Sequence, residues 1–321
     1  MNVDRTMLMD RLQEGLRASP VTALLGPRQC GKTTLARAIV PPGGENYFDL
    51  ENPRDLARLA TPQTALEGLR GLVVLDEIHR RPDLMPLLRV LADRRPPPCR
   101  FLLLGSASPD LIRNASETLA GRIHFVPMGG FTLDEVGLPA MRSLWLRGAF
   151  PAAFLAASER ASLKWREDFI QTFLERDMPQ LGFRFPAMTL RRFWTMVAHY
   201  HGQTWNGSEI GASLGVSHHA VRRHLDALTG AYMLRQLPPW CANVGKRVVK
   251  SPKVYLRDSG LLHALLGIND ATALSAHPKI GASWEGFVIE QLLAWAGDRD
   301  PCFRGTYSRA DLDLPLVRKG W

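Results

Sequence analysis

The stretch VTALLGPRQCGKTTLARAIV, residues 21–40, decides the fold of the first part of the chain. Its opening residues, 21–25, are apolar and predict a buried strand, and residues 35–40 predict a helix that ends before two prolines. Between them lies the pattern GxxxxGK[ST], formed by Gly26, Gly31, Lys32 and Thr33. A strand, a glycine-containing loop and a helix in this order predict a phosphate-binding loop.

The residue types of this loop explain how it would hold a nucleotide. Glycines let backbone N–H groups turn inward around an anion, and the helix N-terminus adds the positive end of its dipole. We expect Lys32 to reach the β- and γ-phosphates and the Thr33 hydroxyl to ligate Mg²⁺. Cys30 holds a variable loop position and is expected to be a bystander. The predicted nucleotide-binding residues are Gly26, Pro27, Arg28, Gln29, Cys30, Gly31, Lys32, Thr33 and Thr34.

Two acidic residues follow a second apolar run, at residues 72–75. Ligands of open α/β sheets bind beyond the carboxyl ends of the strands, which is where Asp76 and Glu77 would emerge. We expect Asp76 to hold Mg²⁺ through water and Glu77 to polarise the attacking water. Acidic residues also end strands for solubility alone, but the phosphate-binding loop upstream favours the catalytic role.

A third apolar run, residues 101–104, ends in the sequence GSAS. A hydroxyl there can sense the γ-phosphate or cap the next helix, and we assign Ser106 the first role and Ser108 the second. Arg122 follows that helix and is a candidate to stabilise transition-state charge, in cis or from a neighbouring subunit of a homo-oligomer. The alternative for Arg122 is an ordinary surface residue. The predicted catalytic residues are Glu77, Lys32, Ser106 and Arg122.

Four segments together resemble a known family: GPRQCGKTT, LVVLDEIHRRPDL, LLLGSASPDLI and LAGRIHFVPMGGFTLDEVG. They are similar to prokaryotic AAA+-like P-loop ATPases that carry a C-terminal domain of unknown function. The resemblance implies an α/β fold with a five-stranded parallel sheet, and ATP and Mg²⁺ as cofactors. It places Walker A at residues 26–34, Walker B at Asp76 and Glu77, and sensor 1 near Ser106. His79 stands where the family usually has Gln, so no role carries over to it.

The middle of the chain predicts helices followed by a winged helix. Apolar residues of the segment 159–181 fit one helical face and suit a lid. The stretch SEIGASLGVSHHAVRRHLDAL, residues 208–228, has the helix-turn-helix pattern, with a turn at Gly215 and a helix cap at Ser217. A strand and a wing hairpin are expected beyond it. The predicted DNA-binding residues are His218, His219, Arg222, Arg223, Lys246, Arg247 and Lys250.

The charge of the chain is compatible with this DNA contact. The net charge is +9 and the isoelectric point is about 9.8, which permits binding to nucleic acid. Only seven of the 40 basic residues are lysine, and three of them, Lys246, Lys250 and Lys253, lie in the expected wing. An arginine-rich composition, or a winged helix that binds protein, are the alternatives.

The last residues, SRADLDLPLVRKGW at 308–321, alternate acidic and apolar side chains as a strand would. The resemblance implies a restriction-endonuclease-like domain here, to which Glu285 and Asp313 match by position, while Asp311 replaces the more usual Glu. The later E-x-K pair of the family is missing, and two carboxylates alone give a metal ion too few ligands. We therefore expect a truncated nuclease-like domain without cutting activity.

Length and composition set the frame for these predictions. The 321 residues and 45% hydrophobic content suit a globular protein of several domains. We expect a P-loop AAA+-like ATPase domain at 1–140, a helical lid at 141–187, a winged helix at 188–255 and the incomplete α/β nuclease-like domain at 256–321. No apolar run is long enough for a membrane span, no signal peptide is recognisable, and four cysteines without CxxC spacing suit a reducing cytoplasm.

Three functions are open from the sequence. The first is a Mg²⁺-dependent ATPase that couples ATP hydrolysis to a task associated with DNA. The alternative is a nucleotide-gated switch for protein interaction or transcription, in which slow hydrolysis only resets the state. A metal-dependent nuclease is disfavoured by the missing E-x-K pair.

Overall fold

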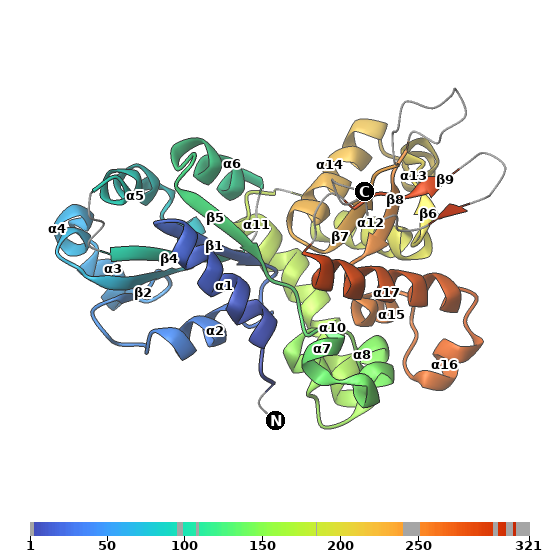
Figure 1. Ribbon diagram of the computed structural model, residues 1–321. Helices are drawn as coiled ribbons and strands as arrows, with labels where there is room; N and C mark the ends of the chain where they lie inside the picture. The colour runs from blue at the N-terminus through green and yellow to red at the C-terminus, as the bar shows by residue number, and fades with distance from the viewer. Residues whose placement is uncertain are drawn as a thin grey trace. The chain divides into compact units, whose positions relative to one another are not determined.

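The apolar runs predicted as strands pair in one sheet. The computed structural model describes residues 3–94, 99–106, 109–183, 185–239, 251–297, 301–305 and 311–312. The chain forms two compact units, 1–129 and 130–321, which we describe one at a time. The sheet of the first unit is parallel throughout, with the strand order β2-β3-β4-β1-β5 (Figure 1). This confirms the expected five-stranded parallel sheet. Its strands are β1 (Val21–Gly26), β2 (Tyr47–Asp49), β3 (Gly71–Asp76), β4 (Cys99–Ser106) and β5 (Ile123–Pro127).

Helices cover both faces of this sheet, as the near-continuous apolar strands require. Leu24, Val74 and Leu102 pack with Leu12 of α1 and Leu35 of α2 in one buried cluster. In Figure 1, α2 lies below the sheet and α5 and α6 lie above it. The helices are α1 (Thr6–Ala18), α2 (Lys32–Ile39), α3 (Pro53–Arg58), α4 (Pro62–Glu67), α5 (Met85–Ala92) and α6 (Pro109–Thr118), with 3₁₀ turns at Ile78–Arg80 and Pro82–Leu84.

The second unit begins with helices that pack around a large apolar core. The expected helix of the segment 159–181 forms, and its Phe169, Ile170, Phe173 and Leu174 are buried as predicted. Helix α10 continues into a π-helical turn, Phe173–Asp177, whose Phe173 ring lies 5.4 Å from that of Trp194. These helices are α7 (Leu133–Val136), α8 (Met141–Arg147), α9 (Pro151–Phe154), α10 (Glu159–Thr172), α11 (Met178–Gln180) and α12 (Ala187–His199), with a 3₁₀ turn at Leu138–Ala140.

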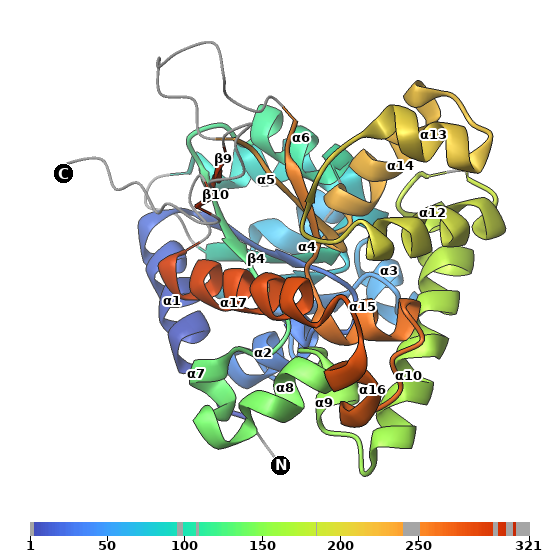
Figure 2. The same ribbon diagram turned by 90° about the vertical axis from the view of Figure 1, so that its right-hand side faces the viewer.

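The two helices predicted around Gly215 form next to each other (Figure 2). Gly215 has φ +67°, a left-handed conformation that glycine adopts without strain. The Ser217 hydroxyl caps the second helix by accepting a hydrogen bond from the Ala220 N–H at 3.2 Å. A three-stranded antiparallel sheet of order β6-β8-β7 belongs to the same region. The elements are β6 (Gln203–Thr204), α13 (Gly207–Leu214), α14 (His218–Gly230), β7 (Leu234–Leu237) and β8 (Lys253–Leu256).

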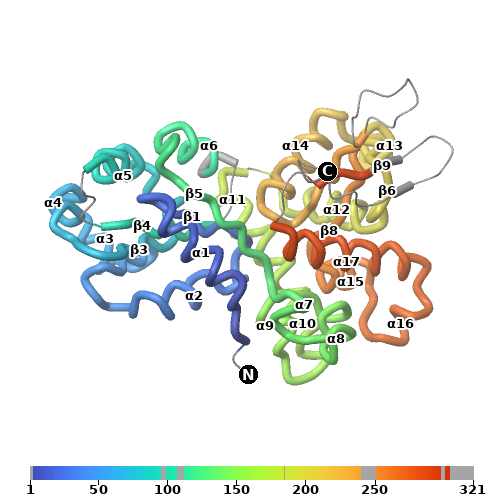
Figure 3. Tube along the Cα trace, in the orientation of Figure 1, coloured from blue at the N-terminus to red at the C-terminus, as the bar shows by residue number. Residues whose placement is uncertain are grey.

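The remaining helices follow β8 and can be traced in Figure 3. The sequence at residues 281–295 predicts a helix with Phe287, Leu292 and Trp295 pointing largely inward. Phe287 of α17 is buried as expected, but Leu292 and Trp295 are 41% and 56% exposed. The prediction that both point inward was wrong, because α17 is apolar on every side and its sequence does not single out one buried face. The elements are α15 (Ser259–Leu265), α16 (Ala271–Ala276), α17 (Ile280–Ala296) and the antiparallel pair β9 (Arg304–Gly305) and β10 (Asp311–Leu312).

Two further sequence expectations concern spans and cysteines. Within the described ranges, no helix has both the length and the apolarity needed to cross a bilayer. Cys30, Cys99 and Cys302 are buried and form no disulfide among the described residues, and Cys241 lies outside those residues. The cytoplasmic location and the four-part domain division stay predictions.

Candidate functional site

The loop between β1 and α2 has a backbone that its glycines make possible. A Cβ added to Gly26 would lie 2.0 Å from the Met128 carbonyl oxygen, so only glycine fits where the loop leaves the sheet. Gly31 has φ +100°, and Gln29 has φ +62°, which is unusual for a residue with a side chain. The Met128 N–H donates to the Leu25 carbonyl at 2.8 Å, which fixes the end of β5 against the start of the loop. Contacts with the end of β5 therefore hold the start of the loop at the edge of the sheet.

Lys32 lies inside the loop that it follows. Its side chain is buried, and Nζ donates hydrogen bonds to the carbonyl oxygens of Gly26 at 3.1 Å and Pro27 at 2.8 Å. These two carbonyls satisfy part of the ammonium group, which has three donors. The arrangement places a positive charge at the loop and the α2 N-terminus, where a phosphate group would be bound.

Asp76 and Thr33 meet at the carboxyl ends of the strands. Asp76 is the last residue of β3, and its Oδ2 accepts a hydrogen bond from the Thr33 hydroxyl at 2.9 Å. The same oxygen accepts a second hydrogen bond, from the Tyr47 hydroxyl at 2.8 Å. Burial raises the pKa of Asp76, whereas the hydrogen bonds from Tyr47 and Thr33 lower it. Hydroxyl and carboxylate oxygens are the ligands that Mg²⁺ prefers, so this pair fits the predicted metal site.

Glu77 begins the turn after β3 in a left-handed conformation, with φ +57°. This backbone conformation is costly for a glutamate. Its Oε2 lies 3.1 Å from Nδ1 of His79, and both side chains are largely buried. Burial alone would raise the pKa of Glu77, but His79, Lys32 and Arg28 together lower it below its ordinary value. Glu77 is therefore held ionised beside the loop, in the state that a general base requires.

Ser106 ends the central strand β4 directly beside the loop. It pairs in register with Gly26, and its hydroxyl oxygen is buried without a hydrogen-bond partner among the described residues. A buried polar group without a partner is uncommon in folded proteins and marks a place where an unseen group can bind. This is the position predicted for the γ-phosphate sensor. Ser108, the predicted helix cap, lies outside the described residues.

The other residues of the loop have distinct surroundings. Arg28 Nη2 lies 3.3 Å from Glu51 Oε1, which also lies 3.5 Å from Nε of Arg80. The Cys30 thiol is fully buried, and the Cys30 carbonyl accepts a hydrogen bond from Arg5 at 3.2 Å. The thiol faces the protein interior, which agrees with its expected role as a bystander.

Arg122 lies away from the loop. It directly precedes β5, and its carbonyl accepts a hydrogen bond from Val21 N–H, the first residue of β1, so it sits at the amino-terminal edge of the sheet. Its guanidinium pairs with Asp93 through Nε–Oδ1 at 2.5 Å and Nη2–Oδ2 at 3.0 Å. Because the phosphate-binding loop is at the opposite edge, the predicted role in cis does not fit this position. Action on a neighbouring copy stays a prediction.

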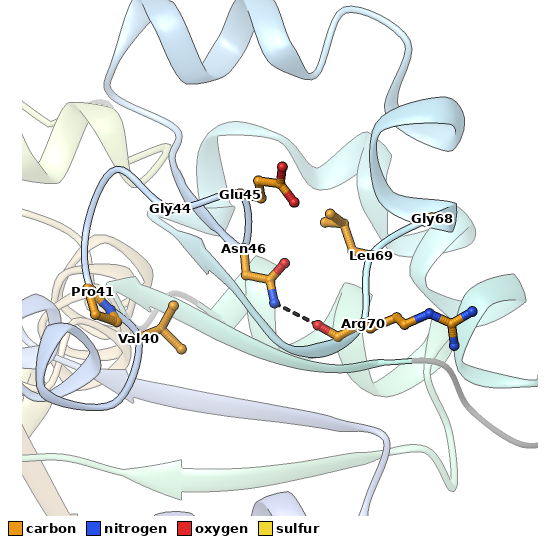
Figure 4. Close-up of a pocket in the computed structure, with 8 residues that line it drawn as sticks. All are labelled: Val40, Pro41, Gly44, Glu45, Asn46, Gly68, Leu69 and Arg70. Carbon is orange, nitrogen blue, oxygen red and sulfur yellow. Dashed lines mark hydrogen bonds between the residues drawn. The ribbon is translucent and has the colours of Figure 1, made fainter.

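A shallow depression also lies at that amino-terminal edge. Figure 4 shows the residues that line it, among which the Asn46 side chain donates to the Arg70 carbonyl at 2.7 Å. The strand ends that carry Asp76 and Ser106 are at the other edge of the same sheet. The depression is thus separate from the loop. Its lining residues are Val40, Pro41, Gly44, Glu45, Asn46, Gly68, Leu69 and Arg70.

The cationic residues predicted on α14 face outward. His218, His219, Arg222 and Arg223 are all exposed, and Arg222 Nε pairs with Asp226 at 3.0 Å. Lys246, Arg247 and Lys250 lie outside the described residues.

Lys253, predicted to lie in the wing hairpin, is a residue of the antiparallel strand pair β7 and β8. It belongs to β8, is buried, and its Nζ lies 5.4 Å from the centre of the Phe303 ring. The alkyl stem of a lysine packs as an apolar group, which explains how the side chain joins the core.

The predicted nuclease-like residues are only partly described. Glu285 of α17 accepts a hydrogen bond from the Tyr255 hydroxyl, and Asp313 lies outside the described residues. Within the described part of the chain, no group of three or more His, Cys, Asp or Glu residues could hold a metal ion. The nuclease-like interpretation therefore stays a prediction.

Sequence reasoning missed one member of the site, Tyr47. It belongs to no motif, and its contact with Asp76 depends on the pairing of β2 with β3. The signal that could have found it is a polar aromatic residue at the start of a short strand that is parallel to the one carrying Asp76.

Comparison with known families divides the chain in a similar place. Residues 18–137 match a family described as an AAA domain, and residues 138–272 match a domain of unknown function, DUF8612. The first unit, with its parallel sheet and loop, is thus a P-loop AAA-type domain.

Two curated relatives match along the whole chain. The chain is 54% identical over 320 residues to the uncharacterized protein Rv2008c of Mycobacterium tuberculosis and to Mb2031c of Mycobacterium bovis, and covers 73% of each. Among solved structures, the Walker-type ATPase PABY2304 of Pyrococcus abyssi is similar with a TM-score of 0.59 and 17% identity, over 83% of this chain and 96% of that one. This likeness agrees with the P-loop ATPase fold. With that identity and coverage, the chain belongs to the family of these mycobacterial proteins, with an AAA domain followed by DUF8612.

Proposed function

We propose that the protein binds ATP with Mg²⁺ and hydrolyses the β–γ phosphoanhydride bond. The observation that carries the proposal is the assembly of Lys32, Thr33, Asp76, Glu77 and Ser106 at one edge of the sheet, next to a loop in which Gly26 admits no side chain. Each of these side chains has the chemistry that phosphoryl transfer needs.

Each residue of the site would have its own role in ATP hydrolysis. Lys32 would exchange its two carbonyl partners for phosphate oxygens, and the loop N–H groups would supply further donors. Thr33 and Asp76 would hold the Mg²⁺ ion, which when bound neutralises charge on the β- and γ-phosphates. Ionised Glu77 would orient a water and accept its proton. The Ser106 hydroxyl, which has no described partner, would donate to the transferred group.

Phosphate release by the full chain tests this function. We expect Lys32→Ala to abolish Mg²⁺- and ATP-dependent release of phosphate, and Glu77→Gln to keep nucleotide binding while slowing turnover. Lys164→Ala is the matched control, since Lys164 is an exposed lysine paired with Asp168 in the second unit. Phosphate release by Lys32→Ala equal to that of the wild type would reject the site.

A second proposal concerns the second unit, which we propose contains a winged helix that contacts DNA. Supporting it are the helix–turn–helix of α13 and α14, the sheet order β6-β8-β7, and four exposed cationic or imidazole side chains on α14. Exposed arginines and histidines near a helix N-terminus suit phosphate and base contacts. ATP hydrolysis would then serve a task on DNA.

The salt dependence of duplex binding tests the DNA proposal. Each phosphate contact contributes roughly −0.9 to the slope of log K against log salt, so Arg222→Ala with Arg223→Ala should flatten that slope by up to about 2. The control is Arg160→Ala with Arg176→Ala, which removes the same charge from exposed positions on α10 and the π-helical turn. Equal slopes for the two double variants would contradict a contact through α14.

The alternative, a nucleotide-gated switch for protein interaction or transcription, uses the same site with slower chemistry. It predicts tight ATP binding and a turnover that DNA leaves unchanged. Phosphate release measured with and without duplex DNA separates the two.

A further inference from the structure

Tyr47 contacts the carboxylate that the metal site depends on, although no motif includes it. We propose that Tyr47 is a positioning residue of the Mg²⁺ site: its hydroxyl fixes Asp76 in the orientation that binds the ion. The proposal rests on the function proposed above and adds a residue to the same site.

The sheet brings Tyr47 to Asp76 by strand register. Tyr47 is the first residue of β2 and pairs with Val74 of β3. Asp76 is two residues beyond Val74, so both lie on one face of the sheet. Tyr47 is 2% exposed and its hydroxyl donates to Oδ2 of Asp76 at 2.8 Å. The ring therefore spans the step between the start of β2 and the carboxyl end of β3.

Three donors together define the orientation of the Asp76 carboxylate. Oδ2 accepts from the hydroxyls of Tyr47 and Thr33, and Oδ1 accepts from the Glu77 N–H at 3.0 Å. Thr33 is itself a predicted metal ligand and Glu77 lies in a strained turn, so the contacts of both are expected to change as the site is used. Tyr47 is anchored in the core and is the donor that stays in place.

The hydroxyl also has an electrostatic effect on a buried acid. A carboxylate removed from water is costly unless donors compensate it. Asp76 is 2% exposed, and the Tyr47 hydroxyl is one of the donors that compensate its buried carboxylate. Loss of the hydroxyl would leave the Asp76 carboxylate with one donor fewer and less constrained, which would weaken a metal site.

The ring and the hydroxyl of Tyr47 have separate roles. The ring packs with Leu35, Val74 and Leu102 in the buried cluster, and Arg37 lies 5.9 Å from its centre. Phenylalanine would keep this packing and lose only the hydroxyl. Partners of metal ligands of this kind typically contribute 10–100-fold, as an order of magnitude, to metal affinity.

The experiment measures metal dependence of nucleotide binding rather than turnover. Binding of the fluorescent analogue mant-ATP is titrated in EDTA, and then at fixed mant-ATP with increasing MgCl₂. We expect Tyr47→Phe to raise the MgCl₂ midpoint at least roughly 10-fold while leaving the affinity in EDTA unchanged. Tyr200→Phe is the matched control, because it removes a hydroxyl that donates to Glu209 at 3.0 Å in the second unit.

A double-mutant cycle with Asp76→Asn separates positioning from a general loss of structure. If Tyr47 acts through Asp76, Tyr47→Phe has no further effect on the MgCl₂ midpoint in the Asp76→Asn background. An unchanged midpoint in the single variant, or an equal shift in both backgrounds, overturns the proposal. Absence of mant-ATP binding by the wild type would reject the proposed function itself, whereas Mg²⁺-dependent binding that Tyr47→Phe leaves intact rejects only the role of Tyr47.

Discussion

The phosphate-binding loop of the first unit and the α14 surface of the second unit both carry charged side chains, but in opposite surroundings. Lys32 and Asp76 are buried, and each has at least two hydrogen-bond partners within 3.1 Å. Arg222 and Arg223 are exposed, and the described partner of Arg222 is a neighbour one helical turn away. Buried charges are positioned by the fold and support specific chemistry. Exposed charges act mainly through the electrostatic field that they produce together.

The second unit also contains a buried ion pair. It tests whether burial, rather than membership of the first unit, decides how strongly a charged side chain depends on its partners. Glu290 of α17 pairs with Arg235 Nη2 at 3.0 Å and Arg257 Nε at 3.1 Å. We expect Glu290→Gln to lower the free energy of unfolding by about 3–5 kcal/mol near neutral pH, because the buried Arg235 and the partly buried Arg257 lose a charged partner. All eight tryptophans belong to this unit, so urea unfolding followed by tryptophan fluorescence reports it.

The same variant has a defined pH dependence. Burial would raise the pKa of Glu290, but Arg235 and Arg257 outweigh it and hold the pKa below its ordinary value of 4.5. The pair therefore stabilises the wild type fully above pH 4.5 and is lost as pH falls through the lowered pKa. The gap between wild type and variant should shrink below pH 4.5. A gap that is constant down to pH 3 would contradict this account.

In the loop, the next largest effect is expected from Gly26→Ala. The added methyl group would lie 2.0 Å from the Met128 carbonyl oxygen, so the loop or β5 must move. We expect a loss of about 1–3 kcal/mol in stability and no detectable mant-ATP binding. Gly68→Ala is the control, since its Cβ would meet nothing within 4 Å. Wild-type binding by Gly26→Ala would show that the loop is less tightly built than the contacts indicate.

Ser106→Ala should separate function from stability. The hydroxyl is buried without a described partner, so its removal relieves an uncompensated polar group and should not destabilise the fold. Turnover should fall roughly 100-fold if the hydroxyl donates to the transferred phosphate. A variant that melts earlier but turns over ATP normally would indicate a structural serine.

The smallest effect is expected on α14. Asp226→Ala removes the exposed partner of Arg222, and we expect a change of less than about 0.5 kcal/mol in stability. Duplex DNA binding should strengthen slightly, because a repelling carboxylate is lost beside two arginines. Urea unfolding and fluorescence anisotropy of a labelled duplex measure the two quantities, and weaker binding would contradict the proposed DNA surface.

The sequence predicted most of what is local in this molecule. The strands around residues 21–25, 72–75 and 101–104 form as predicted, because apolar runs between a loop motif and acidic or hydroxyl residues are typical of strands in a parallel sheet. Ser217 caps α14 as predicted, because a capping hydrogen bond joins residues only three positions apart.

Residue positions that depend on contacts between distant parts of the sequence could not be predicted. Tyr47 reaches Asp76 through a strand register, and Arg122 lies at the far edge because parallel strands all begin there. The buried Lys253 has its Nζ 5.4 Å from the centre of the Phe303 ring. Each of these positions follows from contacts between residues far apart in the sequence. Neither hydrophobic periodicity nor a local motif specifies such contacts.

Isothermal titration of the wild type with ATP in MgCl₂, beside Lys32→Ala, tests the central claim most directly. The account predicts saturable heat with one site per chain for the wild type and none for the variant. The absence of heat with the wild type, or equal heat from both proteins, would contradict it.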